Sequence, residues 1–298
     1  MIERSHIPVL LEEVMDYLDI RRKGIYVDCT IGLGGHSLEI LKRNPQANVI
    51  GIDIDEQSLL KAKDRLIPFA ERVELYHSDF RYLPDLEMDF SRVNGVLLDL
   101  GISSFQLDTP ERGFSFNQDG PLDMRMDQRN KVSASKIINT YSEHKLAAIF
   151  RQYGELRQAR LLARELVSRR KAKKIQKTIE LRQLVEEVCR WRPQKGKIHP
   201  AAKVFQALRI EVNQELEDLS KFLERIASKI SQGARILVIS FHSLEDRIVK
   251  HTFVRLAATR NNHALLRILT KKPVVPSEKE IRRNTRARSA KLRAAERI

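Results

Sequence analysis

Apolar runs and helical spacing alternate along the first hundred residues. Residues 9–18 show helical spacing, and runs typical of buried strands follow at 25–28, 49–53, 73–77 and 96–100. Helical spacing separates the first three runs, most clearly over 57–66. Strands that alternate with helices form parallel sheets covered on both faces. The pattern therefore predicts a doubly wound α/β sheet.

A fifth apolar run, 235–241, comes only after a long interruption. The interruption begins with a loop rich in Gly, Asp and Pro over 101–127 and continues with mostly helical sequence over 133–192. We therefore expect a helical domain inserted into the sheet domain after its fourth strand. The expected division is 116–209 for the insert, with 1–115 and 210–298 for the sheet domain.

The remaining patterns complete the sheet. Helical spacing over 204–211 and 215–230 leads back to the fifth strand. The β-like runs 265–270 and 290–295 are suited to an antiparallel pair at the edge of the sheet.

Bulk features narrow the class of protein. No stretch of about 18 apolar residues occurs, so we expect no membrane span. The N-terminus lacks the apolar segment of a signal peptide, and Cys29 and Cys189 lack the spacing of metal ligands. These features predict a reduced, cytoplasmic protein without a metal, and they leave a homodimer open.

Positive charge is concentrated in two blocks. Residues 151–200 carry 15 Lys and Arg against 5 Asp and Glu, and residues 271–298 carry 10 against 3. The rest of the chain is close to neutral, although the whole carries +15. Blocks of this kind suit a polyanion such as nucleic acid, and solvated basic helices are the plainer alternative.

A glycine-rich turn follows the first predicted strand. The sequence 26–36 passes from apolar residues through Asp28 to Gly32, Gly34 and Gly35, and a helical pattern follows at once. Glycine lets the backbone turn tightly and approach a ligand at such a strand end. Asp53 ends the second run nineteen residues after Gly34, a distance at which an acidic side chain can accept the hydroxyls of a ribose. An ordinary turn with a solvated Asp is the alternative.

The residues around this turn favour one cofactor. Ser37 stands where a dinucleotide fingerprint has its third glycine, and the turn has no Lys for a phosphate. An adenosine ligand without a pyrophosphate remains, and S-adenosylmethionine fits. Its positive sulfonium suits the carboxylates of Asp28 and Asp53.

Acidic residues also follow the next two strands, as Asp79 and Asp99. Four acidic strand ends would meet at one edge of a parallel sheet. Phe80 is suited to stacking on an adenine with Asp79 near the exocyclic amine, although a Phe after a strand also suits the core. The sequence after Asp99 lacks the two prolines and the aromatic residue that many amino-group methyltransferases have there.

Long strings of residues resemble one family nearly from end to end. They are HIPVLLEE (6–13), GGHS (34–37), LLDLGISS (97–104), ERGFSF (111–116), GPLDMRMD (120–127), YGE (153–155), HPA (199–201), FQALRI (205–210) and ISFHSLEDR (239–247). The family is that of RsmH, also called MraW, the bacterial 16S rRNA cytosine-N4 methyltransferases. The resemblance implies a Rossmann-like class I methyltransferase fold and S-adenosylmethionine as the cofactor.

The resemblance also implies a substrate and a set of contacts. The substrate would be a decoding-centre cytidine in helix 44 of 16S rRNA, near the P site, within the small ribosomal subunit. The implied cofactor contacts are Gly34, Gly35, His36, Asp53, Phe80, Asp99 and Gln106, of which Gln106 rests on the resemblance alone.

Three segments depart from the usual family pattern. Cys29 and Ile31 replace Gly and Phe in the glycine turn, and Leu156-Arg157-Gln158-Ala159 replaces Glu-Arg-Phe-Ala. The segment 255–265 is shorter than usual. None removes an implied cofactor contact, and the last two could alter RNA docking.

Candidates for RNA binding and catalysis lie elsewhere in the chain. A cytosine must leave its stack to be methylated, so we expect single-stranded capture or base flipping. We expect RNA phosphates to be held by Arg157, Arg160, Arg164, Arg169, Arg170, Lys173 and Lys174. The candidates around the target base are Asp99, Asp123 and His242. Alternatively, Asp123 fixes its Gly-Pro loop and His242 caps the next helix; Asn213 faces the same choice between packing and substrate contact.

Two other classes of protein stay open at this point. One is a non-catalytic RNA-binding factor for small-subunit assembly that keeps the nucleotide fold. The other is a nicotinamide oxidoreductase, which Ser37 and the basic blocks disfavour.

Overall fold

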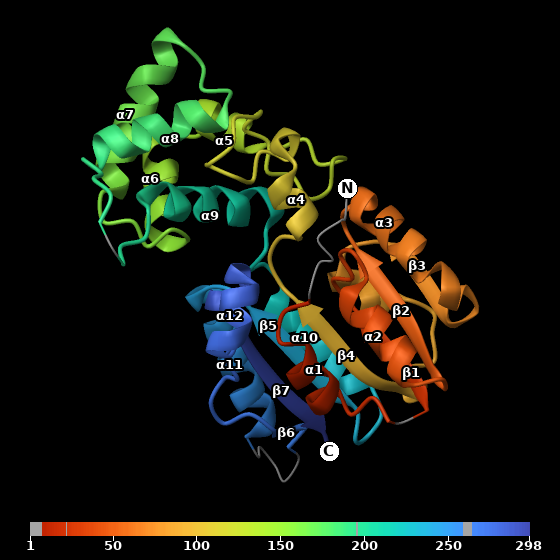
Figure 1. The fold of residues 1–298 in the computed structure, drawn as a ribbon. Coiled ribbons are helices and arrows are strands. Elements are labelled where there is room, and N and C mark those ends of the chain that lie inside the picture. The colour runs from red at the N-terminus through yellow and green to blue at the C-terminus, as the bar shows by residue number, and fades with distance from the viewer. Residues whose placement is uncertain (1–7, 22, 195, 259–263) are drawn as a thin grey trace. The chain divides into compact units, whose positions relative to one another are not determined.

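The computed structural model describes residues 8–21, 23–194, 196–258 and 264–298. The chain forms two compact units, one of Met1–Gly101 with Leu216–Ile298 and the other of Ile102–Glu215 (Figure 1). We call them the sheet unit and the helical unit.

The described residues of the sheet unit contain a seven-stranded sheet. Its strands are β1 (Gly24–Asp28), β2 (Ala47–Asp53), β3 (Val73–His77), β4 (Val93–Asp99), β5 (Arg235–Ser240), β6 (Leu266–Ile268) and β7 (Lys291–Arg297). Their order is β3-β2-β1-β4-β5-β7-β6, with β1 to β5 parallel and β7 antiparallel to both neighbours. This is a Rossmann-like class I methyltransferase sheet, so the predicted parallel sheet with an antiparallel closing pair is confirmed.

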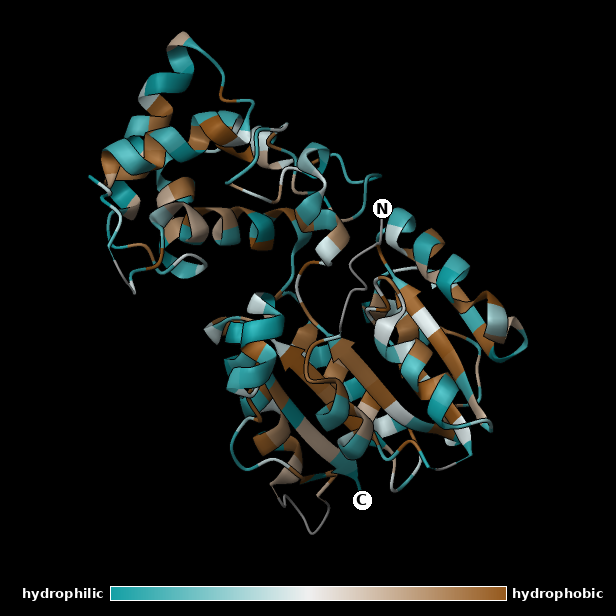
Figure 2. Ribbon diagram, viewed as in Figure 1, coloured by the Kyte–Doolittle hydropathy of each residue, from teal (hydrophilic) through white to brown (hydrophobic). Residues whose placement is uncertain are grey.

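Helices cover both faces of this sheet. They are α1 (Leu11–Leu18), α2 (Gly35–Arg43), α3 (Glu56–Leu66), α10 (Leu219–Lys229) and α11 (Ser243–Ala257). A further short helix, α12 (Glu278–Arg283), has no buried residue. Successive strand residues alternate between the faces: Tyr26 packs with α1, α2 and α3, and Val27 packs with α10 and α11. The central strands of the sheet are accordingly mostly brown, the colour of hydrophobic residues, in Figure 2. Short 3-10 helices are η1 (Ile67–Arg72), η2 (Phe80–Asp85), η3 (Phe90–Arg92) and η5 (Thr285–Ser289).

The helical unit has its own apolar core. Its helices are α4 (Ser104–Asp108), η4 (Pro110–Arg112), α5 (Ala134–Thr140), α6 (Glu143–Gln152), α7 (Ala159–Ala172), α8 (Thr178–Val188) and α9 (Pro200–Asn213). The side chains of Ser133 and Ser142 cap α5 and α6, which breaks the long helical pattern into separate helices. The loop before α5 belongs to the same core, because Leu122 and Met124 are fully buried in it.

Several bounds differ from those expected from the sequence. Residues at both ends of the expected insert pack in the helical unit: Phe114 and Val212 lie in its core, and Asn213 bonds Met124 and Met126. The unit therefore extends over 102–215 rather than 116–209. The last long helix before β5 starts at Leu219 rather than residue 215, because Asp218 has a left-handed backbone.

No helix among the described residues has the length and apolar character needed to cross a membrane.

Candidate active site and nucleic-acid surface

The glycine turn connects β1 to α2 at the carboxyl edge of the sheet. Gly32 and Gly34 have φ of 52° and 75°, in the left-handed region that favours glycine. The turn is held between neighbouring strands, since the Cys29 amide donates to Leu97 of β4 and the Ile31 amide donates to Ile52 of β2. This puts the turn in the place expected for a ligand-binding loop.

The two family departures in this turn are buried. Cys29 and Ile31 are 1% and 4% exposed. A Cβ atom on Gly51 would lie 2.3 Å from the Cδ1 atom of Ile31, so the branched side chain occupies space that a glycine in β2 leaves free. The departures are therefore accommodated by packing within the sheet unit.

Asp53 at the end of β2 is joined to the glycine turn. Its Oδ2 accepts the Gly32 amide at 2.7 Å, and its Oδ1 accepts the Asp55 amide at 2.8 Å. Burial raises the pKa of Asp53 to about 7, against these two backbone hydrogen bonds. Two backbone amides thus fix the orientation of this carboxylate, and its pKa lies close to neutral pH.

Asp28 at the end of β1 is 2% exposed. Its Oδ2 accepts the Ser37 hydroxyl at 2.7 Å. Burial raises the pKa of Asp28 to about 6. In the sequence Ser37 served only to exclude a dinucleotide site, and its role as the partner of Asp28 was missed.

Asp99 at the end of β4 is the least satisfied of these carboxylates. Its Oδ1 is buried without a hydrogen-bond partner among the described residues, and its Oδ2 lies 3.8 Å from Nδ1 of His36. The Thr30 hydroxyl accepts the Asp99 amide at 2.6 Å. Burial, followed by the charges of Asp28 and Glu245, raises the pKa of Asp99 to about 8. A buried acceptor without a partner is costly, and such groups are common at functional sites.

The raised pKa gives a stability prediction. An unfolded Asp titrates near 4, so between pH 4 and about 8 the folded protein binds a proton at Asp99 that the unfolded chain has lost. Asp99 therefore lowers the stability of the unliganded protein as the pH rises through this range. We expect the melting temperature of Asp99→Asn to exceed that of the wild type by a margin that grows from pH 5 to pH 8. Thermal melts across this range check it, and a margin that does not change with pH would contradict it.

His36 and Phe80 lie at the same strand ends. Nε2 of His36 is 3.0 Å from the Val9 carbonyl oxygen. Phe80 follows β3 and packs edge-on against Phe222 of α10, with ring centroids 5.0 Å apart. Both oxygens of Asp79 already accept hydrogen bonds from Arg81.

The glycine turn, the start of α2 and the ends of β1, β2 and β4 are thus joined by side-chain contacts at one edge of the sheet. Predicted site residues at this edge are Asp28, Gly34, Gly35, His36, Asp53 and Asp99, and Phe80 follows the neighbouring strand β3. Gln106 belongs to the helical unit. There it forms a capping box with Ser103, donating its amide to the hydroxyl and accepting the Ser103 amide. Its cofactor contact stays a prediction.

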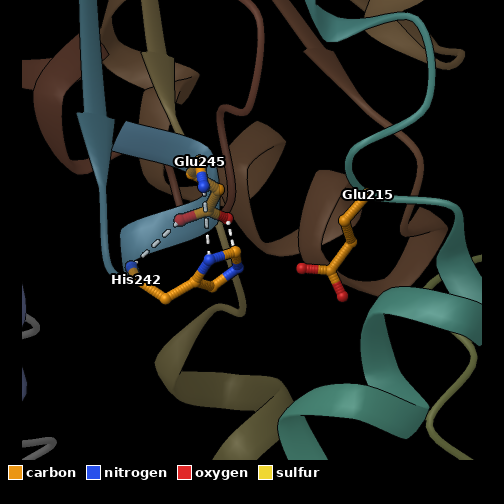
Figure 3. Close-up of side chains that lie close together, drawn as sticks. All are labelled: Glu215, His242 and Glu245. Carbon is orange, nitrogen blue, oxygen red and sulfur yellow. Dashed lines mark hydrogen bonds and ion pairs between the residues drawn. The ribbon is translucent and has the colours of Figure 1, made fainter. Parts of the chain in front are cut away.

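Three of the candidate substrate residues have structural partners. Arg125 binds Asp123 through both carboxylate oxygens, at 2.7 Å each. Asn213 accepts the Met126 amide and donates to the Met124 carbonyl. His242 caps α11: its Nδ1 accepts the Glu245 amide, and Glu245 accepts the Phe241 and His242 amides (Figure 3). These contacts give Asn213 a packing role, His242 a helix-capping role and Asp123 a partner in its own loop, and the substrate contacts of all three stay predictions.

Figure 3 also shows Glu215, whose carboxylate forms an ion pair with Arg209 within the helical unit.

The seven predicted RNA-binding cations fall into two groups in the helical unit. Arg169 pairs with Glu187, Arg170 donates to the Ile138 carbonyl, and Lys173 pairs with Glu180, whose pKa its hydrogen bond lowers to about 2. The other four are exposed and have no short contact of this kind with another described residue, since Arg164 only lies 4.0 Å from Glu165; they are Arg157, Arg160, Arg164 and Lys174. We call these four the open cations, and they are fewer than the seven that the charge pattern predicts.

Two motif segments lie partly outside the described residues. The structure does not describe His6 and Ile7 of the first family string, nor residues 259–263 of the segment that is shorter than usual.

Comparisons with known proteins give relatives that match almost the whole chain. The ribosomal RNA small subunit methyltransferase H of Cyanothece sp. is 50% identical over 296 residues, covering 99% of this chain and 96% of the relative. The protein of the same name from Carboxydothermus hydrogenoformans is 47% identical over 312 residues, covering 100% and 99%. Among solved structures, a putative methyltransferase from Streptococcus mutans in complex with SAH aligns at a TM-score of 0.44 and 11% identity, over 98% of this chain and 100% of that one.

The model of the MraW methylase family matches residues 3–298. The predicted fold class and the predicted cofactor, S-adenosylmethionine, are those of this family, and the resemblance seen in the sequence is confirmed. The chain belongs to the MraW methylase family.

Proposed function

We propose that this protein methylates the N4 amine of a decoding-centre cytidine, in helix 44 near the P site of 16S rRNA, within the cytoplasmic small ribosomal subunit. The name of the relatives supports ribosomal RNA of the small subunit as the substrate. The observation that carries the chemistry is Asp99, a buried carboxylate with an unpartnered oxygen and a pKa raised to about 8.

The residues at this edge fit the cofactor. Asp28, Asp53 and Asp99 are buried carboxylates with raised pKa values, and a positive ligand would relieve their mutual repulsion. When bound, S-adenosylmethionine supplies an electrophilic methyl group on a sulfonium. Gly34, Gly35 and His36 of the turn, with Asp53, Phe80, Asp99 and Gln106, are the residues that we propose to hold it.

Asp99 is our preferred proton acceptor. An exocyclic amine loses a proton when it is methylated, and a general base is most effective when its pKa is near the working pH. Asp99 meets this condition, and its free Oδ1 can accept a hydrogen bond. Asp123 and His242 remain weaker candidates, because Arg125 and Glu245 already bind them.

The open cations give a test of RNA binding with a matched control inside one helix. Arg160 and Arg164 of α7 are exposed at a spacing of four residues, which places them on one helix face. We expect Arg160→Gln with Arg164→Gln to weaken binding of small-subunit RNA. The slope of log K against log salt concentration should become shallower by about 0.9 for each phosphate contact that is lost. The control pair is Arg169→Gln with Arg170→Gln, which removes the same charge from residues that Glu187 and the Ile138 carbonyl hold closely, whereas Arg164 is 4.0 Å from Glu165. An equal loss of salt dependence in both pairs would contradict the division between the open cations and the cations that bind protein groups.

Transfer of a radiolabelled methyl group to small-subunit RNA tests the proposed activity against the assembly-factor alternative. Methyl transfer that Asp53→Ala reduces would exclude a purely binding role. A thermal shift with S-adenosylhomocysteine but none with NAD would exclude the oxidoreductase.

A further inference from the structure

A small aromatic cluster lies where α8 ends and α9 begins in the helical unit. The His199 ring stacks on Phe116, with centroids 5.1 Å apart and planes 21° apart. Trp191 packs edge-on against the same His199 ring, also at 5.1 Å. None of the structural or catalytic roles described above uses Trp191, although the HPA string that contains His199 is one of the family motifs.

Hydrogen bonds fix the His199 ring at its edge. Its Nδ1 accepts the Ala201 amide at 3.1 Å as the cap of α9, and its Nε2 lies 3.0 Å from Glu186. The ring therefore cannot turn without breaking both contacts. A ring held in this way is a rigid support for the indole beside it.

Trp191 itself is only partly buried. In the described part of the helical unit it is not among the residues that form or pack against the apolar core. Ile198, which precedes His199 in the chain, is 69% exposed. Trp191 and Ile198 are therefore exposed or half-buried apolar side chains in a polar loop, and the His199 ring supports one side of the indole.

The loop that carries Trp191 and Ile198 holds charge of one sign, and Glu186 of α8, which lies beside His199, is bound by Arg182. Residues 189–203 carry five Lys and Arg and no Asp or Glu. Arg190, Arg192 and Lys197 are exposed, and none forms an ion pair with another described residue. An aromatic side chain flanked by unpaired cations is the arrangement that single-stranded nucleic acids bind, with a base on the ring and phosphates on the cations.

We propose that the surface of Trp191, Arg190, Arg192 and Lys197 binds a single-stranded segment of the RNA, with one base stacked on the indole. This inference rests on RNA as the substrate in the proposed function. It adds a second RNA contact to the open cations, and its recognition is by stacking, so it tolerates different bases.

Trp191 is the single tryptophan of the chain, so its fluorescence reports on this surface alone. The probes are an oligouridylate of about ten nucleotides and an abasic oligoribonucleotide of the same length and charge. We expect the oligouridylate to quench the fluorescence on binding, and the abasic chain to bind more weakly without quenching. Binding is measured separately by the anisotropy of a label on the RNA.

Variants separate stacking from charge. We expect Trp191→Ala to weaken oligouridylate binding about tenfold, and Trp191→Phe to restore most of it, because base stacking needs an aromatic face. Arg192→Gln should retain full quenching at saturation. The slope of its log K against log salt concentration should become shallower by about 0.7, the value for one phosphate contact of a single strand. Rescue by Phe distinguishes stacking from a loss of folding.

Two results would overturn the proposal. One is unchanged fluorescence when anisotropy shows saturation by oligouridylate. The other is quenching by intact small subunits but not by protein-free 16S RNA, which would assign the surface to a protein partner. Methyl transfer measured in parallel keeps the two proposals apart: transfer without quenching contradicts the stacking surface alone, and quenching without transfer contradicts the proposed activity alone.

Discussion

Replacing Asp99 with Asn should lower kcat by about 10²- to 10⁴-fold while the protein stays folded. The carboxylate lies at the end of β4 with one buried, unpartnered oxygen, and its pKa is raised to about 8. Asn has the same shape but cannot take up a proton, so the loss should match that of a general base. Single-turnover methyl transfer at saturating S-adenosylmethionine and RNA measures it.

The matched control is Asp28→Asn. Asp28 belongs to the same buried group of carboxylates, but the Ser37 hydroxyl already binds it. We expect a much smaller loss of kcat there. For the wild type, kcat/KM should rise with pH and level off above about pH 8, because the base acts when deprotonated, and Asp99→Asn should lose this rise. If Asp99→Asn is more stable than the wild type at pH 8 but inactive, a merely structural role of Asp99 is excluded. Full activity of Asp99→Asn would exclude Asp99 as the general base.

Asp53→Ala should weaken S-adenosylmethionine binding by about 10- to 150-fold. Its carboxylate holds Gly32 of the glycine turn and is placed to accept the ribose hydroxyls. Hydrogen bonds to a charged group contribute about 1.5–3 kcal/mol, which corresponds to that range. Isothermal titration calorimetry with S-adenosylmethionine and S-adenosylhomocysteine measures both affinities.

Asp55→Ala separates cofactor binding from a general loss of stability. Asp55 is two residues further on and caps α3 by accepting the Gln57 amide. Its removal should cost about 1 kcal/mol of folding stability and leave the cofactor affinity unchanged. If both variants lost affinity equally, the ribose contact of Asp53 would be rejected.

The sheet could be predicted because β1, β2, β4 and β5 are largely buried and therefore appear in the sequence as apolar runs. Asp28, Asp53 and Asp99 could be placed at one edge for the same reason, since parallel strands end together. The beginning of β4 at Val93 was missed because Asn94 and Gly95 interrupt its apolar run.

Side-chain partners from distant segments could not be predicted. Ser37 and Thr30 hold acidic strand ends through contacts that depend on the folded turn. The seven cations of the insert look alike in sequence, yet Glu180 and Glu187 of α8 bind two of them. Local spacing does show some partners: His242 and Glu245 stand three residues apart, as in a capping box.

The central claim is that this protein methylates cytosine N4 in the decoding centre. Mass spectrometry of decoding-site RNA from cells with and without the gene tests it most directly. The account predicts that one methyl group on cytosine N4 is lost with the gene and returns with the wild-type protein but not with Asp99→Asn. Loss of a methyl group from a ring carbon or a ribose, or no loss at all, would contradict it.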